Sequence, residues 1–147
     1  MKNPAGRPLR YPTEQVVGVL MVRAPYHPLS EVTVVVAKAL LTASGWSWPS
    51  RSMAVYQDGR QEEIRGAPPL GDAVPHLLDP GTVGGLLGQL AEVCGDRVSW
   101  EIGCNLQSSP LFWLRLRARD HQREWHGQSL GEVVGLALIA RRARARR

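Results

Sequence analysis

Cysteine is too scarce in this sequence to support a disulfide framework or a structural zinc site. The 147 residues contain two cysteines, Cys94 and Cys104, whereas disulfide-rich folds and four-ligand zinc sites need more thiols or closely spaced Cys and His pairs. Both cysteines lie at positions with an apolar pattern, where a free thiol packs as a small hydrophobic side chain. We therefore expect a reducing compartment, the cytoplasm.

Long hydrophobic runs are also lacking. The longest extends over residues 16–22, is interrupted by Gly18, and is far shorter than a membrane-spanning helix requires. Residues 1–12 contain no apolar core of the kind found in a signal peptide. We expect a soluble protein with no membrane partner.

The body of the chain has no excess of positive charge. The net charge is +5, from 18 basic and 13 acidic residues, but the last seven residues contain five arginines: Arg141, Arg142, Arg144, Arg146 and Arg147. Without these five the count is 18 − 5 = 13 basic residues against 13 acidic ones. A body without net positive charge argues against a protein that binds duplex DNA, because such proteins need a basic face to neutralise the phosphates. Residues 141–147 are predicted to be a separate basic tail that binds a polyanion.

Motifs for catalysis are missing too. The sequence has no His-Glu-x-x-His, Cys-x-x-Cys, Gly-x-Ser-x-Gly or P-loop pattern. Its densest polar cluster contains Asp120, His121, Glu124 and His126. Such a cluster suits a transition metal, but a solvated hairpin tip explains it equally well. We expect no enzymatic activity, no metal and no cofactor.

Helical patterns are present in three places. Ser30 precedes apolar residues at helical spacing (Val32, Val35, Val36, Ala39, Leu40) and Gly45 follows them, which favours a helix although the valine run has strand propensity. Asp79-Pro80 begins a second helix that ends before Gly95. A capping box at Ser129 begins a third helix, over 130–140, which is apolar on more than one side.

The second helix has an unusual cluster of glycines, Gly81, Gly84, Gly85 and Gly88. Glycine lowers helix stability by about 1 kcal/mol relative to alanine, so close packing against a sheet or another subunit should compensate. A phosphate site at the helix N-terminus is the alternative. The glycines, together with the apolar residues on more than one side of the third helix, predict a homo-oligomer.

Strand patterns fill the remainder. Residues 53–56 and 61–65 flank Asp58-Gly59 and predict a short, polar edge hairpin, and a loop follows over 66–71. Trp46 and Trp48 are either core anchors or a stacking wall. Residues 97–104 alternate as a strand. Residues 1–12 are predicted to form a flexible arm, whereas the pattern over 13–28 fits both a helix and a buried strand.

The strand over 111–119 carries the candidate ligand site. Alternation gives it a core face of Phe112, Leu114, Leu116 and Ala118 and an opposite face of Trp113, Arg115, Arg117 and Arg119. A turn at Asp120-His121 would place Arg117 opposite Glu124 and Arg115 opposite His126. Arginine pairs bidentately with phosphate and tryptophan offers a stacking face for a base. We therefore predict an anion or nucleotide site at Trp113, Arg115, Arg117 and His126, unless this face is merely solvated or is covered by a helix.

These elements predict one α+β domain over residues 13–140, with a mostly antiparallel sheet and helices packed on it. The order of segments resembles that of small phage proteins with an α/β/α-sandwich domain. The resemblance covers about residues 31–140 and rests on Ala-Leu-Leu-Thr-Ala-Ser-Gly-Trp over 39–46, on Leu78-Asp79-Pro80, on the two Trp-containing strands, and on Ser-Leu-Gly-Glu-Val-Val-Gly-Leu-Ala-Leu over 129–138. It implies an α/β/α-sandwich-like fold, and no ligand residue of the family maps onto this chain.

A group related to that family, the Thoeris anti-defence sponge proteins, binds cyclic ADP-ribose-type signals and cyclic oligonucleotides in oligomers. The resemblance therefore implies a non-enzymatic phage accessory protein that sequesters an anionic nucleotide signal in the host cytoplasm. Two alternatives remain open. One is a protein that binds and inhibits a host defence complex, as anti-CRISPR proteins do, and the other is a nucleic-acid-binding accessory protein that uses the arginine tail.

Overall fold

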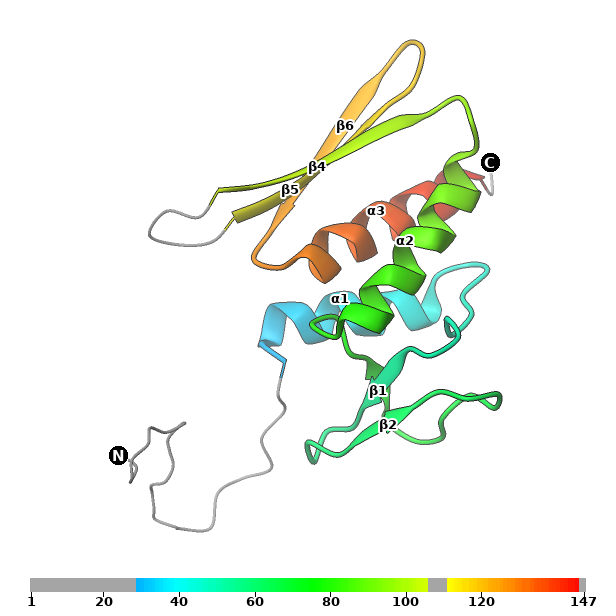
Figure 1. Cartoon of the computed structure of the whole chain (residues 1–147), viewed down its shortest axis with the longest axis vertical. Coiled ribbons are helices and arrows are strands. Elements are labelled where there is room, and N and C mark those ends of the chain that lie inside the picture. The colour runs from blue at the N-terminus through cyan, green and yellow to red at the C-terminus, as the bar shows by residue number, and fades with distance from the viewer. Residues whose placement is uncertain (1–28, 106–110, 146–147) are drawn as a thin grey trace.

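The computed structural model describes residues 29–105 and 111–145. These residues form helices α1 (Glu31–Thr42), α2 (Pro80–Cys94) and α3 (Leu130–Ala145) and strands β1 (Met53–Val55), β2 (Gln61–Glu63), β3 (Val74–Pro75), β4 (Ser99–Asn105), β5 (Leu111–Arg117) and β6 (Gln122–Gly127). The strands make two antiparallel sheets, in the orders β2-β1-β3 and β4-β5-β6. The predicted α+β class is confirmed. The helices lie between the two sheets (Figure 1), so the layers run sheet, helices, sheet.

Helix α3 lies at the centre of this arrangement. It contacts α1, α2, β5 and β6, and Val133, Val134, Ala137 and Leu138 are fully buried. Its glycines permit close approach, since a Cβ at Gly131 would lie 1.9 Å from the carbonyl oxygen of Leu77. The apolar residues on several sides of α3 are thus buried within one chain, and they do not require a second subunit.

Helix α1 begins where it was predicted, with Ser30 Oγ accepting from the backbone N–H of Thr33 at 3.2 Å. Its buried face is different from the predicted one. Thr33, Val36, Ala37 and Leu40 are buried, whereas Val32 and Val35 are 57% and 66% exposed. The buried stripe is shifted by one residue at its start because Thr33, whose hydroxyl bonds to Ser30 Oγ at 2.8 Å, lies on the inner side.

The predicted hairpin around Asp58-Gly59 is confirmed. Gly59 has a φ of 91°, and Asp58 Oδ1 accepts from the Arg60 N–H at 2.9 Å. Strand β1 is not an edge strand, however, because β3 pairs with its other side. This short strand, which contains Pro75, was not predicted, since two residues carry too little periodicity to be recognised.

The pairing of β5 with β6 corrects the predicted register. The turn lies at Arg119-Asp120, because Ala118 N–H donates to the carbonyl of His121 at 2.9 Å. Arg115 is therefore opposite Glu124, and Trp113 is opposite His126. This shift of two residues keeps the side chains of β5 on their predicted faces, because strand side chains alternate with a period of two. Strand β5 ends at Arg117, however, so Arg119, predicted on the outer face, lies in the turn.

The C-terminal boundary also needs correction. Helix α3 continues to Ala145, so Arg141, Arg142 and Arg144 belong to the helix and not to a separate tail. Arg142 Nη2 donates to Gln89 Oε1 at 3.0 Å, and the Arg144 guanidinium contacts the His121 ring. Polar groups on the body thus hold this last turn. The predictions for 1–12, for 13–28, and for Arg146 and Arg147 lie outside the described residues.

Candidate functional site

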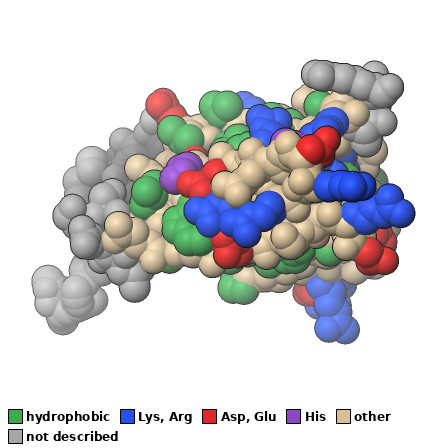
Figure 2. Space-filling model, turned by 90° about the horizontal axis from the view of Figure 1, so that it is seen from above, with side chains coloured by type: hydrophobic (Ala, Val, Ile, Leu, Met, Phe, Trp, Pro, Cys, Tyr) green, Lys and Arg blue, Asp and Glu red, His purple; other side chains and the backbone are tan. Residues whose placement is uncertain are grey.

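The predicted ligand residues lie together on the outer face of the β4-β5-β6 sheet. Trp113, Arg115 and Arg117 come from β5 and His126 from β6, and Trp113 is directly opposite His126. Basic and acidic side chains are intermixed on this face of the molecule (Figure 2). The helices lie on the opposite side of the sheet (Figure 1), so they leave this face uncovered.

The arginines of this outer face are paired with neighbouring residues. Arg115 Nε donates to Glu124 Oε1 at 2.8 Å, and its Nη1 contacts Glu101. Arg117 Nε donates to Gln122 Oε1 at 3.0 Å. The hydrogen bond from Arg115 lowers the pKa of the Glu124 carboxyl, and the bond from His126, 2.6 Å away, lowers it further, while burial opposes both. An incoming anion would have to compete with two carboxylates for Arg115.

The indole of Trp113 is likewise engaged. A Cβ at Gly103 would lie 2.1 Å from Trp113 Cζ2, so the ring lies against the bare backbone of β4. The Arg115 guanidinium carbon is 4.9 Å from the ring centroid, a cation–π distance. The outer face is therefore a connected network whose stacking and charged groups already have partners.

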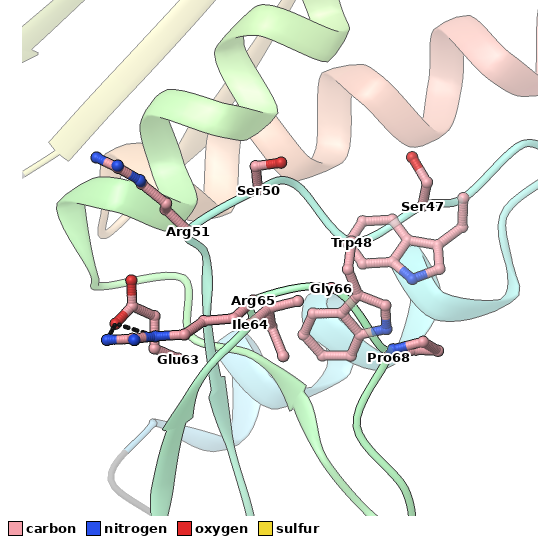
Figure 3. Close-up of a pocket in the computed structure, with 10 residues that line it drawn as sticks. Ser47, Trp48, Ser50, Arg51, Glu63, Ile64, Arg65, Gly66 and Pro68 are labelled. Atoms are coloured by element: carbon pink, nitrogen blue, oxygen red, sulfur yellow. Dashed lines mark hydrogen bonds and ion pairs between the residues drawn. The ribbon is translucent and has the colours of Figure 1, made fainter.

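A pocket of about 890 Å³ lies elsewhere, between the loop after α1 and the end of the β1-β2 hairpin. We call it the Trp48 pocket. Its lining residues are Trp46, Ser47, Trp48, Ser50, Arg51, Glu63, Ile64, Arg65, Gly66 and Pro68. Figure 3 shows Trp48 and Pro68 at one end and Arg51, Glu63 and Arg65 at the other. The pocket thus has an aromatic end and a charged end.

Two indoles build the aromatic end. The ring centroids of Trp46 and Trp48 are 5.6 Å apart with an interplanar angle of 72°, an edge-to-face contact. Trp48 also packs against a small buried cluster made of Ala54, Tyr56, Ile64 and Ala73. Trp46 Nε1 is buried and donates to no atom among the described residues. The predicted core anchoring of this pair is confirmed. The indoles also line the pocket, so a stacking wall there stays a prediction.

Arg51 has the most unusual backbone at the charged end. Its φ of 62° makes it the one residue other than glycine with a positive φ in the described ranges. A side chain in this left-handed region costs on the order of 1–2 kcal/mol. The conformation is held by Arg51 N–H donating to the carbonyl of Ile64 at 3.2 Å and by Ser52 Oγ donating to the carbonyl of Pro49 at 2.7 Å. Backbone strain of this kind concentrates at functional sites.

Arg51 also differs from the other pocket arginine in its pairing. Arg65 Nη2 lies 2.9 Å from Glu63 Oε1. Arg51 forms no ion pair with any carboxylate in the part of the chain that the structure describes. With two guanidiniums and one carboxylate, the charged end has a formal charge of +1. The Arg51 side chain points away from Trp48 and Pro68 (Figure 3), so its unpaired guanidinium is available to an anion at the outer side of this end.

One face of α2 holds the pocket loop in place. A Cβ at Gly85 would lie 2.3 Å from Pro49 Cβ, and a Cβ at Gly81 would lie 3.0 Å from the carbonyl oxygen of Arg51. Gln89 Nε2 donates to the carbonyl of Ser47 at 2.9 Å. Positions 81, 85 and 89 share a face because they are four residues apart. Two of the clustered glycines are thus closely packed, but against the loop after α1 and not against the predicted sheet or second subunit, and Gly84 and Gly88 face open space.

The sequence alone did not indicate Arg51 and Arg65 as site residues. The one feature of the sequence that pointed to this region is the spacing of Gly81, Gly85 and Gln89 on α2. Small residues four positions apart indicate a helix face that another segment approaches closely. The sequence does not show which segment approaches this face, because the contact joins Ser47 and Gln89, which are 42 residues apart. The sequence did identify the two indoles as a possible stacking wall.

The half-buried Arg142 of α3 is connected to the pocket loop by hydrogen bonds. Arg142 donates to Gln89 Oε1, and Gln89 in turn donates to Ser47. Burial lowers the pKa of the Arg142 guanidinium, and Glu92 opposes this through its charge. Arg142 is therefore linked to Ser47 of the pocket loop through Gln89, and its side chain also lies close to Gly45, just before that loop.

No family model, curated protein or solved structure matches the chain. The resemblance to phage sandwich proteins therefore stays a prediction from the residues. No three His, Cys, Asp or Glu side chains gather as a metal site within residues 29–105 and 111–145. In the same ranges, no helix is both long and apolar enough to cross a membrane.

Proposed function

We propose that this protein binds an anionic, nucleotide-type small molecule in the Trp48 pocket without converting it chemically. The observation that carries the proposal is the division of the pocket into an aromatic end and a charged end. A nucleotide has the same division, a flat base and a phosphate. In the biological setting that the resemblance implies, such binding sequesters a signal molecule.

The aromatic end suits a base. A base stacked on an aromatic side chain gains about 1–3 kcal/mol. Trp48 and Pro68 lie at this end (Figure 3), so a ring inserted there meets an indole and a pyrrolidine. Trp46 Nε1, a buried donor without a partner among the described residues, lies in the same wall.

The charged end suits a phosphate. A hydrogen bond to a charged group contributes about 1.5–3 kcal/mol, and guanidinium groups match phosphate geometry. Arg51 needs no partner exchange to bind an anion, whereas Arg65 has to leave or share Glu63. We expect Arg51 to be the main phosphate ligand and Arg65 to add to it.

The volume suits a ligand of this size. Pockets for small molecules span about 300–1,000 Å³, and the Trp48 pocket has about 890 Å³. A mononucleotide fits with room to spare, so a larger dinucleotide or cyclic signal is the better candidate. The outer face with Trp113, Arg115, Arg117 and His126 is the second candidate site, and Arg115 there is already bound to Glu101 and Glu124.

The test begins with the full-length protein as purified. Mass spectrometry of the supernatant after heat denaturation should detect a nucleotide, and isothermal titration with ADP-ribose and with a cyclic dinucleotide should give heat with at least one of them. Trp48→Ala should lose this binding, whereas the control Trp113→Ala should keep it. Finding no released nucleotide and no heat with either probe would refute the proposal.

A further inference from the structure

Strand β4 exposes an apolar row on the inner side of its sheet. Trp100 and Ile102 are each 37% exposed, although they lie directly opposite the buried Leu116 and Leu114 of β5. Directly paired residues of antiparallel strands share a face. Helix α3 packs against β5 and β6, so the cover over the inner face ends before it reaches β4.

The edge of β4 is also unprotected. Among the described strands, β4 pairs with β5 alone, which leaves its other edge without a strand neighbour. Edge strands usually avoid sheet extension by being short or by carrying charged side chains. Strand β4 has seven residues, with Glu101 as its one charged residue. It is long enough to accept another strand.

The other sheet edges are different. Strand β6 contains Arg123, Glu124 and His126 within six residues. Strand β2 is Gln61-Glu62-Glu63, three residues that are all exposed. Strand β3, the third of these edges, has two residues, one of which is Pro75. All three carry the charges, the short length or the proline that discourage pairing. By its length and its lack of charge, β4 is the described edge strand best suited to pair with another strand.

The sequence of β4 suits a second copy of itself. In an antiparallel pair related by a two-fold axis, the register centred on Ile102 pairs all seven residues. Trp100 then lies beside Cys104 of the second copy on the same face, so each apolar row gains an apolar neighbour. Glu101 lies opposite Gly103 of the second copy, so no like charges meet.

We propose that two copies of this chain associate through their β4 strands, in the register centred on Ile102, to form one continuous six-stranded sheet. The partner is thus an identical chain, and the interface is the β4 edge with its Trp100–Ile102–Cys104 row. This interface is separate from the Trp48 pocket. It also gives the predicted homo-oligomer a specific surface, which is neither the glycine face of α2 nor the buried helix α3.

The first experiment measures mass by sedimentation equilibrium. The wild-type chain should have twice the monomer mass of 16.2 kDa at micromolar concentration. Ile102→Lys places a charge at the centre of the edge and should raise the dimer dissociation constant by roughly tenfold or more, since 1.4 kcal/mol corresponds to a factor of ten. Gln122→Lys, a lysine on the opposite edge strand β6, should leave the dimer intact. A wild-type mass of 16.2 kDa, or an Ile102→Lys variant that dimerises like the wild type, would overturn the proposal.

The second experiment tests the register on a folded chain. At a two-fold axis through residue 102, the two Cα atoms should be about 4.5–5.5 Å apart, which is within reach of a disulfide. Ile102→Cys combined with Cys104→Ser should therefore form a cross-linked dimer on mild oxidation. Gln122→Cys in the same Cys104→Ser background is the control for random collision. Equal cross-linking of the two variants, or none at position 102, would contradict the register.

Discussion

Two regions of this molecule combine tryptophan with arginine, and they differ in whether the arginines are already paired. On the outer face of β4-β5-β6, Arg115 is bound to Glu124 and Glu101, and the Trp113 ring lies against Gly103. In the Trp48 pocket, Arg51 has no carboxylate partner among the described residues and sits on a strained backbone. Similar residue types in the two regions therefore differ in their availability to a ligand, because a guanidinium paired with carboxylates has to release them first.

The origin of the two regions explains this difference. The outer face arises from alternation along one strand, so carboxylates on the neighbouring strands fall opposite the arginines. The pocket arises where a loop crosses a hairpin end, and its groups come from residues 46–51 and 63–68. Regular pairing satisfies charges within a sheet, whereas a junction of loops leaves groups that a ligand can bind.

The largest effect should appear within β5, between its two faces. Leu114 is fully buried, so Leu114→Ala should lower the free energy of unfolding by about 2–5 kcal/mol. The neighbouring Arg115→Ala should cost a small fraction of that, because ion pairs at the surface contribute little. Urea denaturation of both variants measures the difference. Equal losses would mean that the network of the outer face is as important to the fold as the core.

A smaller effect should distinguish the glycines of α2. A Cβ at Gly85 would meet Pro49 at 2.3 Å, so Gly85→Ala should displace the pocket loop and lower stability by about 1–3 kcal/mol, as overpacking does. Gly88 faces open space, so Gly88→Ala should raise stability by about 0.8–1.0 kcal/mol. The melting temperature should therefore fall for Gly85→Ala and rise for Gly88→Ala. A shift in the same direction for both variants would contradict the close contact of α2 with the loop.

The smallest effect concerns acid stability. The pKa of Glu124 is lowered in the folded state, mainly by the hydrogen bond from Arg115. A lowered pKa stabilises the fold above the unfolded pKa, and this stability is lost as the pH falls through the folded pKa. The wild type should thus lose more stability than Glu124→Gln when the pH falls below the ordinary glutamate value of 4.5. Denaturation midpoints of the two proteins measured across this pH range test the prediction. If the midpoints change with pH in parallel, the Arg115–Glu124 pair does not contribute to acid stability.

Much of the fold followed from local signals in the sequence. Ser30 and Asp79 cap α1 and α2 as predicted, because capping depends on a few adjacent residues. Asp58-Gly59 forms the predicted turn for the same reason. The strand faces of β5 were also correct, since alternation survives the two-residue shift in register.

The remaining features depend on contacts that a single sequence does not reveal. The β5-β6 turn was placed one residue too late because Asp120-His121 and Arg119-Asp120 give the same alternation. The C-terminal arginines were assigned to a tail because the packing of Arg142 on Gln89 involves residues 53 positions apart. The pocket was not predicted because residues 46–51 and 63–68 come together only where the loop meets the hairpin.

The most direct test compares Arg51→Gly with Arg115→Ala in binding a nucleotide probe, ADP-ribose or the cyclic dinucleotide, by isothermal titration. Arg51→Gly removes the unpaired guanidinium, and glycine tolerates the φ of 62°. It should weaken binding by roughly ten- to a hundredfold while leaving the melting temperature unchanged or higher. Arg115→Ala should bind like the wild type. Undiminished binding by Arg51→Gly, or loss of binding by Arg115→Ala, would contradict the assignment of the ligand to the Trp48 pocket.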